Sequence, residues 1–216
     1  MRSGSRLSFQ RNKRMKREKR KVYADYVKRL FDVIFACVFL FVLSPLFLLA
    51  ALAVRIGIGS PVIFRQARGG LDGCEFMILK FRTMTDGRGE DGNPLPDGER
   101  LTRLGIFLRK TSIDELPQLV NILRGEMSFV GPRPQLAEFL PHYTEEEKAR
   151  HSVRPGLTGL AQVSGRNLIP WKKRFALDAE YAKRVSFLLD LKIIILTPFA
   201  LFATSPDGDA ESFYDR

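Results

Sequence analysis

The 216-residue sequence contains few of the residues from which disulfide frameworks and zinc sites are built, with only two cysteines and two histidines. Cys37 falls in an apolar stretch and Cys74 in a predicted hairpin, so their spacing favours neither a disulfide framework nor a zinc site. His142 and His151 lack cysteine partners and are expected to be structural or surface residues. This composition fits a reducing, cytoplasmic setting.

The glycine-rich signatures of common nucleotide-binding folds are also missing. The sequence contains no GxxxxGK[ST] phosphate loop and no GxGxxG fingerprint. A kinase-like ATP site and a dinucleotide-binding domain are therefore disfavoured.

Positive charge is abundant but is confined to the N-terminal end. The formal net charge is +11, and residues 1–29 hold twelve Lys or Arg against Glu18 and Asp25, which gives +10. Basic runs such as residues 11–21 bind nucleic acid or anionic lipid. Because an apolar segment follows, anionic lipid headgroups are the expected partner, and no nucleic acid is expected. A solvated tail without a specific partner is the alternative.

Residues 33–54 form one uninterrupted run without charge. As a straight helix, these residues would be about 33 Å long, which is enough to cross a bilayer core of about 30 Å. Ser44 and Pro45 lie in the middle of the run. Proline removes a backbone donor, so a kink is expected there, and the Ser44 hydroxyl could satisfy a freed carbonyl.

Basic residues flank this apolar run on both sides, with Lys28 and Arg29 before it and Arg55, Arg65 and Arg68 after it. The positive-inside rule then favours cytoplasmic placement of both ends, as in a re-entrant helix-break-helix. A single span with a proline kink is the alternative, supported by the denser charge on the N-terminal side. The residues alone leave both topologies open.

Hydrophobic periodicity predicts a small mixed domain after the apolar run. Lys80 and Arg82 alternate with apolar residues, so both cations should share one strand face. Residues 85–100 are expected to form a loop. Residues 187–204 are largely apolar and are expected to contact the membrane in part, with burial in the core as the alternative. Strands are predicted at residues 62–66 and 75–82. Helices are predicted at residues 101–110, 134–150 and 171–183.

The segment Thr111-Ser-Ile-Asp114-Glu115-Leu-Pro-Gln118 carries two adjacent carboxylates. A carboxylate that attacks activated phosphorus forms an acyl phosphate, which divides one difficult transfer into two easier ones. Neighbouring arginines or a divalent metal would offset the phosphate charge. The alternative is structural, because Ser112 and Glu115 have the spacing of a helix capping box.

A glycine-rich stretch follows at residues 153–167, which include Arg154 and Arg166. Glycine allows backbone N–H groups to approach a ligand closely, and the two arginines could clamp a phosphate. Such turns are common, so this stretch is a weak signal by itself.

In their order along the chain, these motifs resemble the bacterial sugar transferase family, the monotopic phosphoglycosyl transferases. The resemblance runs from about residue 26 to about residue 202, and the basic tail lies outside the family pattern. The chain resembles the minimal catalytic form, without an additional multi-span N-terminal domain. The motifs are Lys28-Arg29-Leu-Phe-Asp32, Leu43-Ser44-Pro45, Lys80-Phe-Arg82-Thr83-Met84, Thr111 to Gln118, Met127 to Pro134, Arg154 to Gly159 and Gln162 to Asn167.

The resemblance implies a reaction and a place for it. A sugar-1-phosphate would move from a nucleotide diphosphate sugar, a UDP-sugar, to polyprenol phosphate, which is undecaprenyl phosphate in bacteria. UMP would be released, and the lipid-linked product would prime glycan or glycoconjugate assembly, including exopolysaccharide and lipopolysaccharide. The catalytic domain and both termini would lie on the cytoplasmic face of the bacterial inner membrane.

The same resemblance assigns roles to particular residues. Asp114 would attack the phosphorus that bears the sugar, and Glu115 would complete the catalytic pair, both helping to hold Mg²⁺. Ser44 and Pro45 would form the break between the re-entrant arms. The residues expected to bind phosphate or nucleotide are Lys80, Arg82, Arg109, Arg133, Arg154 and Arg166.

The expected fold is a mainly helical α+β domain with a kinked re-entrant membrane helix, a small β-hairpin and interfacial helices. The expected divisions are a basic tail (1–25), the membrane helix-break-helix (26–58), a catalytic domain (59–204) and a loose C-terminal tail (205–216). Two other functions stay open, a membrane-tethered scaffold that uses its basic tail and a lipid phosphate phosphatase.

Overall fold

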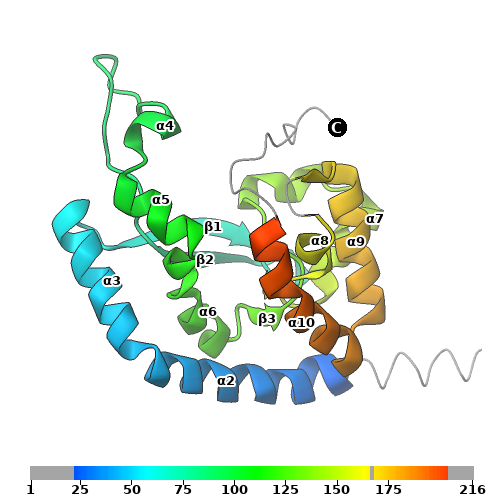
Figure 1. Cartoon of the computed structure of the whole chain (residues 1–216). Helices are drawn as coiled ribbons and strands as arrows, with labels where there is room; N and C mark the ends of the chain where they lie inside the picture. Colours follow the sequence, from blue (N-terminus) through cyan, green and yellow to red (C-terminus); the bar gives the residue numbers. More distant parts are fainter. Residues whose placement is uncertain (1–21, 166–167, 204–216) are drawn as a thin grey trace, which may run out of the picture.

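The computed structural model describes residues 22–165 and 168–203, with side chains described up to residue 200. The fold is mainly helical α+β, as the sequence predicts, and contains two small sheets (Figure 1). The helices are η1 (Tyr23–Val27), α2 (Lys28–Val42), α3 (Ser44–Gly57), η2 (Leu71–Gly73), α4 (Asp97–Arg100), α5 (Arg103–Lys110), η3 (Ile113–Glu115), α6 (Gln118–Arg124), η4 (Ala137–His142), α7 (Glu145–Lys148), η5 (Ala149–Ser152), α8 (Leu160–Val163), α9 (Trp171–Arg184) and α10 (Phe187–Ala203). The strands are β1 (Ile63–Gly69), β2 (Glu75–Phe81), β3 (Ser128–Val130) and β4 (Gly156–Thr158).

The predicted hairpin is confirmed. Strands β1 and β2 pair antiparallel with Ile63 opposite Phe81 and Gly69 opposite Glu75, and they lie at the centre of the domain (Figure 1). The side chain of Asn121, which is fully buried on α6, bonds to the other edge of β2. It accepts from Leu79 N at 3.0 Å and donates to Met77 O at 2.8 Å. These two bonds fix β2 relative to the segment that carries the carboxylates.

A second, parallel sheet of β3 and β4 is not predicted by the sequence. Ser128 pairs with Gly156 and Val130 with Thr158. A Cβ atom on Gly156 would lie 2.1 Å from the Gly131 nitrogen, and one on Gly159 would lie 2.1 Å from the Gly131 oxygen. The close approach that these glycines permit is therefore to the protein's own backbone, rather than to a ligand as the sequence had indicated.

The apolar run is broken in the middle, where a kink is predicted. Leu43 separates α2 from α3, and the two helices meet at a bend of 65°. The Ser44 hydroxyl donates to Phe41 O at 2.8 Å, and Pro45 occupies the first turn of α3. In the described part of the chain, no helix alone has the length and composition to cross a membrane, but the bent pair Tyr23–Val42 and Ser44–Gly57 meets that test together.

One face of α2 packs against the domain rather than facing outward. Its buried residues, Lys28, Asp32 and Ala36, recur every four positions. Asp32 accepts from the Ser128 hydroxyl and the Phe129 amide, at 3.0 and 3.1 Å. Lys28 forms an ion pair at 2.6 Å with Asp190 of α10. The charges beside the apolar run are thus structural anchors as well as flanking charges.

Arg29, the next residue along α2, supports the same packing. Its guanidinium donates to the carbonyls of Ile122 and Leu123 in the last turn of α6. The Ile122 carbonyl also accepts from the Gly125 amide at 3.0 Å, and a cation at a helix C-terminus is favourable. The first helix of the membrane pair is therefore fixed to the helix that follows the carboxylates.

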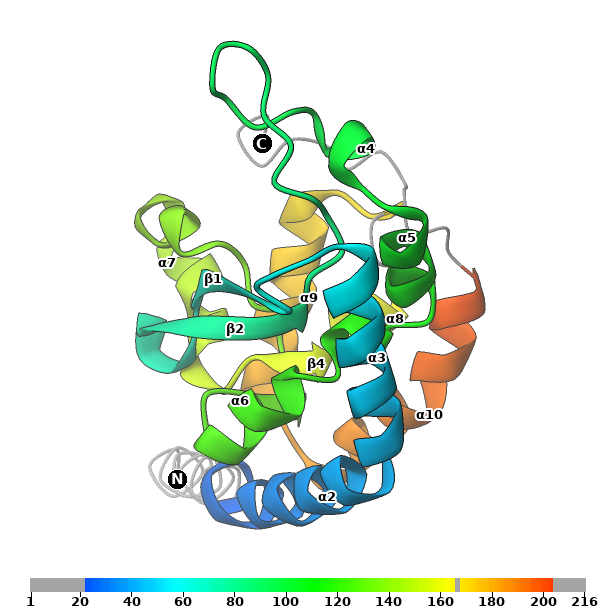
Figure 2. The same cartoon turned by 90° about the vertical axis from the view of Figure 1, so that its left-hand side faces the viewer.

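Helices on one side of the molecule expose many large apolar side chains. Large apolar side chains are exposed on α2, α3, α5 and α10, which lie along one side of the molecule (Figure 2). An exposed apolar area of this extent is typical of a membrane or protein contact. The exposed residues include Phe41, Leu48, Leu52, Ile56, Phe107, Leu188, Ile195 and Phe199.

The C-terminal half holds helices where they are expected. Residues 134–150 carry the three short helices η4, α7 and η5 rather than one long helix; Pro141 lies inside η4, and Thr144 starts α7. Helices α9 and α10 agree with the predicted helix and apolar segment. His151 is buried, with Nδ1 2.9 Å from Gly70 O, so its role is structural. Both cysteines are free and exposed.

Candidate active site

The two carboxylates lie in η3, a short 3₁₀ helix between α5 and α6. Ser112, immediately before it, adopts a left-handed conformation with φ of 57° and makes no capping hydrogen bond with its side chain. The capping-box interpretation of Ser112 and Glu115 is therefore wrong. A non-glycine residue in this region stores strain, as is common at functional sites. The capping box of this chain is at Thr144 and Glu147.

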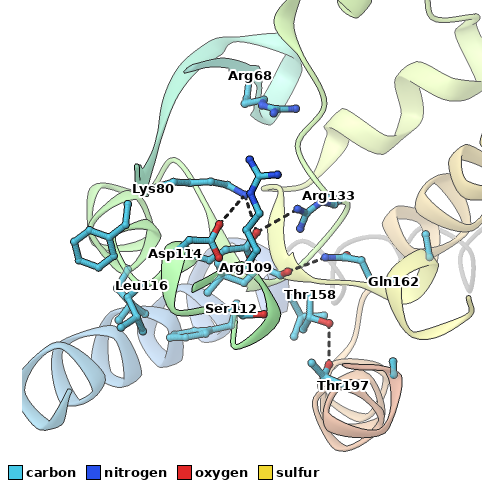
Figure 3. A pocket seen from close by; sticks show the side chains of 18 of the residues that line it. Arg68, Lys80, Arg109, Ser112, Asp114, Leu116, Arg133, Thr158, Gln162 and Thr197 are labelled. Atoms are coloured by element: carbon cyan, nitrogen blue, oxygen red, sulfur yellow. Dashed lines mark hydrogen bonds and ion pairs between the residues drawn. The ribbon is translucent and has the colours of Figure 1, made fainter. Parts of the chain in front are cut away.

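Glu115 is bound to two cations that come from separate elements. Lys80 Nζ, on β2, lies 2.8 Å from Glu115 Oε1, and Arg133 Nη2, in the loop after β3, lies 3.2 Å from the same oxygen. Lys80 Nζ is also 3.9 Å from Asp114 Oδ2 (Figure 3). Strand β2 and the loop after β3 thus bring Lys80 and Arg133, two of the expected phosphate-binding residues, to the carboxylate pair.

The two carboxylates have opposite electrostatic environments. Burial raises the pKa of Asp114 to about 6, although Lys80 partly opposes this shift. Burial would also raise the pKa of Glu115, but Arg133 and Lys80 together outweigh it and lower that pKa to about 2. Asp114 is thus a buried carboxylate whose charge is only partly offset by cations, whereas the charge of Glu115 is fully offset. Such a difference between two neighbouring carboxylates is typical of an active site in which they have different roles.

Arg109 and Arg82 both line the cavity that contains Asp114, with different contacts. Arg109 Nε donates to the Thr83 hydroxyl at 3.1 Å, and the side chain lines the same cavity as Asp114. Arg82 is buried, and its guanidinium donates to Ser60 O at 2.7 Å and to Met84 O at 2.9 Å and pairs with Asp86. Its donors are thus directed to the protein itself.

Of the two arginines of the glycine-rich stretch, the structure describes only Arg154, which does not line the cavity. Arg154 Nε donates to Gly125 O at 3.0 Å, and its side chain is not among those that line the cavity. Arg166 lies outside the described residues.

The carboxylates open into a large cleft of about 1740 Å³. Typical small-molecule sites occupy roughly 300–1,000 Å³, so this volume can hold more than one substrate. One end is cationic, with Lys80, Arg109 and Arg133 around the carboxylates. The other end is apolar and lies between α2 and α10, where it is lined by Phe31, Phe35, Phe39, Phe187, Leu191 and Ile194.

Several residues that shape the site carry no sequence signal of their own. Asn121 fixes β2, as described above. Arg150 is fully buried, pairs with Asp178 at 2.8 Å and donates to Arg133 O at 2.6 Å, so it positions the Arg133 backbone. Arg68 also lines the cleft. A buried arginine paired with a distant aspartate cannot be identified by spacing, because the two residues are 28 positions apart.

The carboxylate pair fits a magnesium site of the kind that substrate phosphates complete. Both cations contact Oε1 of Glu115, and within the described chain no contact is made to Glu115 Oε2 or Asp114 Oδ1. No group of three His, Cys, Asp or Glu residues that could hold a metal occurs in that same part of the chain. Mg²⁺ commonly takes one or two carboxylates and leaves its other positions to phosphate and water.

Together, the fold and the cleft define a class of protein, an enzyme of phosphate chemistry that joins a polar substrate to an apolar one. The family model for bacterial sugar transferases matches residues 23–204. The chain belongs to the bacterial sugar transferase family.

Curated relatives agree with this membership. The chain is 54% identical to an uncharacterized sugar transferase, EpsL, of Bacillus subtilis (strain 168), over 79% of this chain and 85% of that protein. It is 44% identical to a UDP-glucose:undecaprenyl-phosphate glucose-1-phosphate transferase of Caulobacter vibrioides, over 85% of this chain and 73% of that protein. An exopolysaccharide production protein, ExoY, of Sinorhizobium fredii is 42% identical, over 79% of this chain and 83% of that protein.

Proposed function

We propose that this protein transfers a sugar-1-phosphate from a UDP-sugar to undecaprenyl phosphate and releases UMP, as the first step of exopolysaccharide or related glycan assembly. The observation that carries the proposal is the carboxylate pair at the junction of a cationic and an apolar part of one cleft. The name of the 44% identical relative specifies UDP-glucose and undecaprenyl phosphate, so glucose is the first sugar to test.

In the first step, a carboxylate oxygen of Asp114 attacks the phosphorus that bears the sugar. A bond forms between this oxygen and phosphorus, and the bond from phosphorus to the bridging oxygen breaks. UMP leaves with that electron pair, and the sugar phosphate stays on Asp114 as an acyl phosphate. Lys80 and Arg133, which Glu115 holds in place, offset the charge on the reacting phosphate.

In the second step, a phosphate oxygen of the lipid attacks the same phosphorus. The bond to Asp114 breaks, and the free carboxylate is restored. The apolar end of the cleft, between α2 and α10, would receive the first part of the polyprenyl chain while its phosphate reaches Asp114. Because the two substrates react in turn, the kinetics would be ping-pong.

Mg²⁺ would be held by Asp114 and Glu115 through the oxygens that no protein cation contacts. When bound, it would offset negative charge on the substrate phosphates. The protein's own contribution is to hold Lys80 and Arg133 at fixed positions and to keep Glu115 ionised.

The bent pair α2 and α3 would enter and leave the membrane from the cytoplasmic face, as a re-entrant unit. At about 1.5 Å per residue, α2 and α3 are about 22 and 21 Å long, so neither spans a bilayer core of about 30 Å alone. The packing of α2 on the domain supports this placement. We propose residues 26–58 as this unit, residues 59–204 as the catalytic domain and residues 205–216 as a C-terminal tail. The basic tail, whose residues 1–21 lie outside the described structure, would bind anionic headgroups.

The topology can be tested with an impermeant thiol reagent on bacterial spheroplasts. A Ser8→Cys variant that lacks both natural cysteines is compared with a variant that keeps only Cys74, in the catalytic domain. Both thiols are expected to react only after the membrane is permeabilised. Reaction of the Ser8→Cys variant in intact spheroplasts, with Cys74 protected, would show that the pair spans the membrane.

The activity should decline at acid pH with the titration of Asp114. In the free enzyme, before Mg²⁺ and the donor bind, its pKa is raised to about 6, so below that pH the nucleophile is protonated and unreactive. We expect kcat/KM for the UDP-sugar to fall about tenfold per pH unit below pH about 6. Lys80 lowers this pKa, so Lys80→Gln should move the decline to higher pH. A rate that stays level down to pH 4 would contradict the assignment of Asp114.

The proposed function is tested by UMP release from a panel of UDP-sugars, with purified protein, Mg²⁺ and undecaprenyl phosphate. Release that depends on one UDP-sugar and yields a lipid-linked sugar phosphate is expected. A phosphatase would instead release inorganic phosphate from the lipid without any nucleotide sugar, and a scaffold would release nothing. Either result would exclude the transferase.

A further inference from the structure

Arg68 lines the cleft, but the steps described above do not use it. It lies on β1, where its Nη2 donates to Gln66 Oε1 at 2.6 Å and its Nη1 makes a long contact of 3.4 Å to Pro134 O. Its Nε is buried without a hydrogen-bond partner, and within the described residues Arg68 forms no ion pair. An arginine placed in this way is incompletely neutralised by the protein.

The surroundings of Arg68 further disfavour its positive charge. Burial and the nearby charge of Arg133 lower the pKa of Arg68 to about 10, against weaker opposing effects of Glu115 and Glu138. Arg133 pairs with Glu115, but the repulsion between the Arg133 and Arg68 charges outweighs the attraction of Glu115 for Arg68, and an anion that bridges the two guanidinium groups would remove this repulsion. The geometry therefore favours an anion at this point of the cleft.

The position of Arg68 relative to the nucleophile indicates which anion this is. The charges that act on Asp114 are those of Lys80, Glu115, Arg133 and Arg109, and Arg68 is not among them. Arg133 and Glu115 act on both Asp114 and Arg68. Figure 3 shows Asp114 and Arg68 on opposite sides of the Lys80 side chain. A phosphate at Arg68 would thus lie one position beyond the phosphate that Asp114 attacks.

We propose that Arg68, together with Arg133, binds the second phosphate of the donor, the one that leaves with the nucleotide. This inference rests on the proposed function. When the bond from phosphorus to the bridging oxygen breaks, the electron pair stays on that oxygen, so the departing nucleoside monophosphate gains one negative charge. Arg68 offsets this charge as it develops. The attack by the lipid phosphate does not involve the departed nucleotide, so Arg68 serves only the first half of the reaction.

The first experiment measures the two halves separately, in Arg68→Gln and in a matched control, Arg65→Gln. Arg65 is an exposed arginine three residues earlier on the same strand. Without lipid acceptor, the single-turnover release of UMP is expected to be about 10²–10³-fold slower in Arg68→Gln and unchanged in Arg65→Gln. Once the acyl phosphate has formed and the donor is removed, its transfer to undecaprenyl phosphate should proceed at the wild-type rate.

The second experiment measures binding without chemistry, with UMP and uridine as the ligands. Arg68→Gln should weaken UMP binding about tenfold or more, because it removes a charge-assisted contact, and should leave uridine binding unchanged. Retained uridine binding also shows that the variant is folded. Arg68→Lys keeps the positive charge but lacks the planar guanidinium that can donate two parallel hydrogen bonds. Its affinity for UMP should therefore lie between those of Arg68→Gln and the wild type.

Equal slowing of both halves, equal weakening of UMP and uridine, or no change in either measurement would overturn the role of Arg68. Failure of the proposed function would be a different result, in which the wild type itself releases no UMP from any UDP-sugar. In that case the comparison of UMP with uridine would still decide whether Arg68 belongs to a nucleotide phosphate site.

Discussion

Asp114→Asn is expected to lower UMP release from the UDP-sugar by at least about 10³-fold, because the amide cannot form an acyl phosphate. Glu115→Gln should also be impaired, but it should retain some activity because the nucleophile is intact. The measurement is single-turnover UMP release without lipid acceptor. Asp72→Asn is the matched control, since Asp72 is exposed and asparagine tolerates its left-handed conformation.

The same substitution should stabilise the protein. Burial raises the pKa of Asp114 above the ordinary aspartate value, so the folded state binds this proton more tightly than the unfolded state. The ionised carboxylate therefore costs stability. This cost is full above pH about 6, decreases as the pH falls below 6, and is gone only near the ordinary aspartate pKa of about 4. At neutral pH, Asp114→Asn is expected to increase the free energy of unfolding by about 1–2 kcal/mol, as measured by thermal unfolding. Unchanged UMP release in Asp114→Asn would exclude Asp114 as the nucleophile.

Asp190→Ala is expected to destabilise the protein by about 3–5 kcal/mol, the usual cost of leaving a buried charge without its partner. Asp190 is buried in α10 and accepts from Lys28 at 2.6 Å, Tyr23 at 2.7 Å and Tyr181 at 2.6 Å. These contacts fix the start of the membrane pair to α10 and, through the bond from Tyr181 to Val130 O, to β3. Thermal unfolding in detergent or nanodiscs measures the effect.

A double variant separates the ion pair from general packing. Lys28→Met together with Asp190→Leu removes both charges and should recover much of the stability, because no unpaired charge is left in the interior. If the free energy of unfolding of Asp190→Ala is within about 0.5 kcal/mol of the wild-type value, the contacts of Asp190 do not hold α2 and α10 together.

The sequence predicts the elements that depend on local patterns. Alternating apolar residues identify the hairpin that carries Lys80, and the run of residues 33–54 with Pro45 identifies a bent apolar helix. Asp114 and Glu115 stand out because two adjacent carboxylates beside basic residues form an uncommon local pattern. The ordered motifs then identify the family, which the match over residues 23–204 confirms.

Features that depend on contacts between distant segments could not be predicted in this way. The parallel pairing of β3 with β4 needs Gly131 beside Gly156, and nothing in either segment alone specifies that contact. The capping box was misassigned because the spacing of Ser112 and Glu115 is correct, whereas the Glu115 side chain is instead bound by Lys80 and Arg133. Glu115 thus forms ion pairs with residues from distant segments instead of a hydrogen bond with the nearby backbone.

The same limit applies to the arginines. Arg82 and Arg154 have the residue type and the motif of phosphate-binding residues, but their guanidinium groups donate to backbone carbonyls of the protein. Arg68 has no local signal, but it lines the cleft, its Nε has no hydrogen-bond partner, and within the described residues it forms no ion pair with a carboxylate. Only the three-dimensional surroundings distinguish an arginine that serves the fold from one that can accept an anion.

The central claim is that Asp114 carries the sugar phosphate between the two substrates. The most direct measurement is the intact mass of the purified protein after incubation with UDP-glucose and Mg²⁺ but without lipid acceptor, followed by mapping of the modified peptide. The account predicts added mass of one hexose phosphate, located on Asp114, absent from Asp114→Asn and lost when undecaprenyl phosphate is added. Formation of the lipid-linked product by wild-type protein that never carries this mass, at any time before the acceptor is added, would contradict the account.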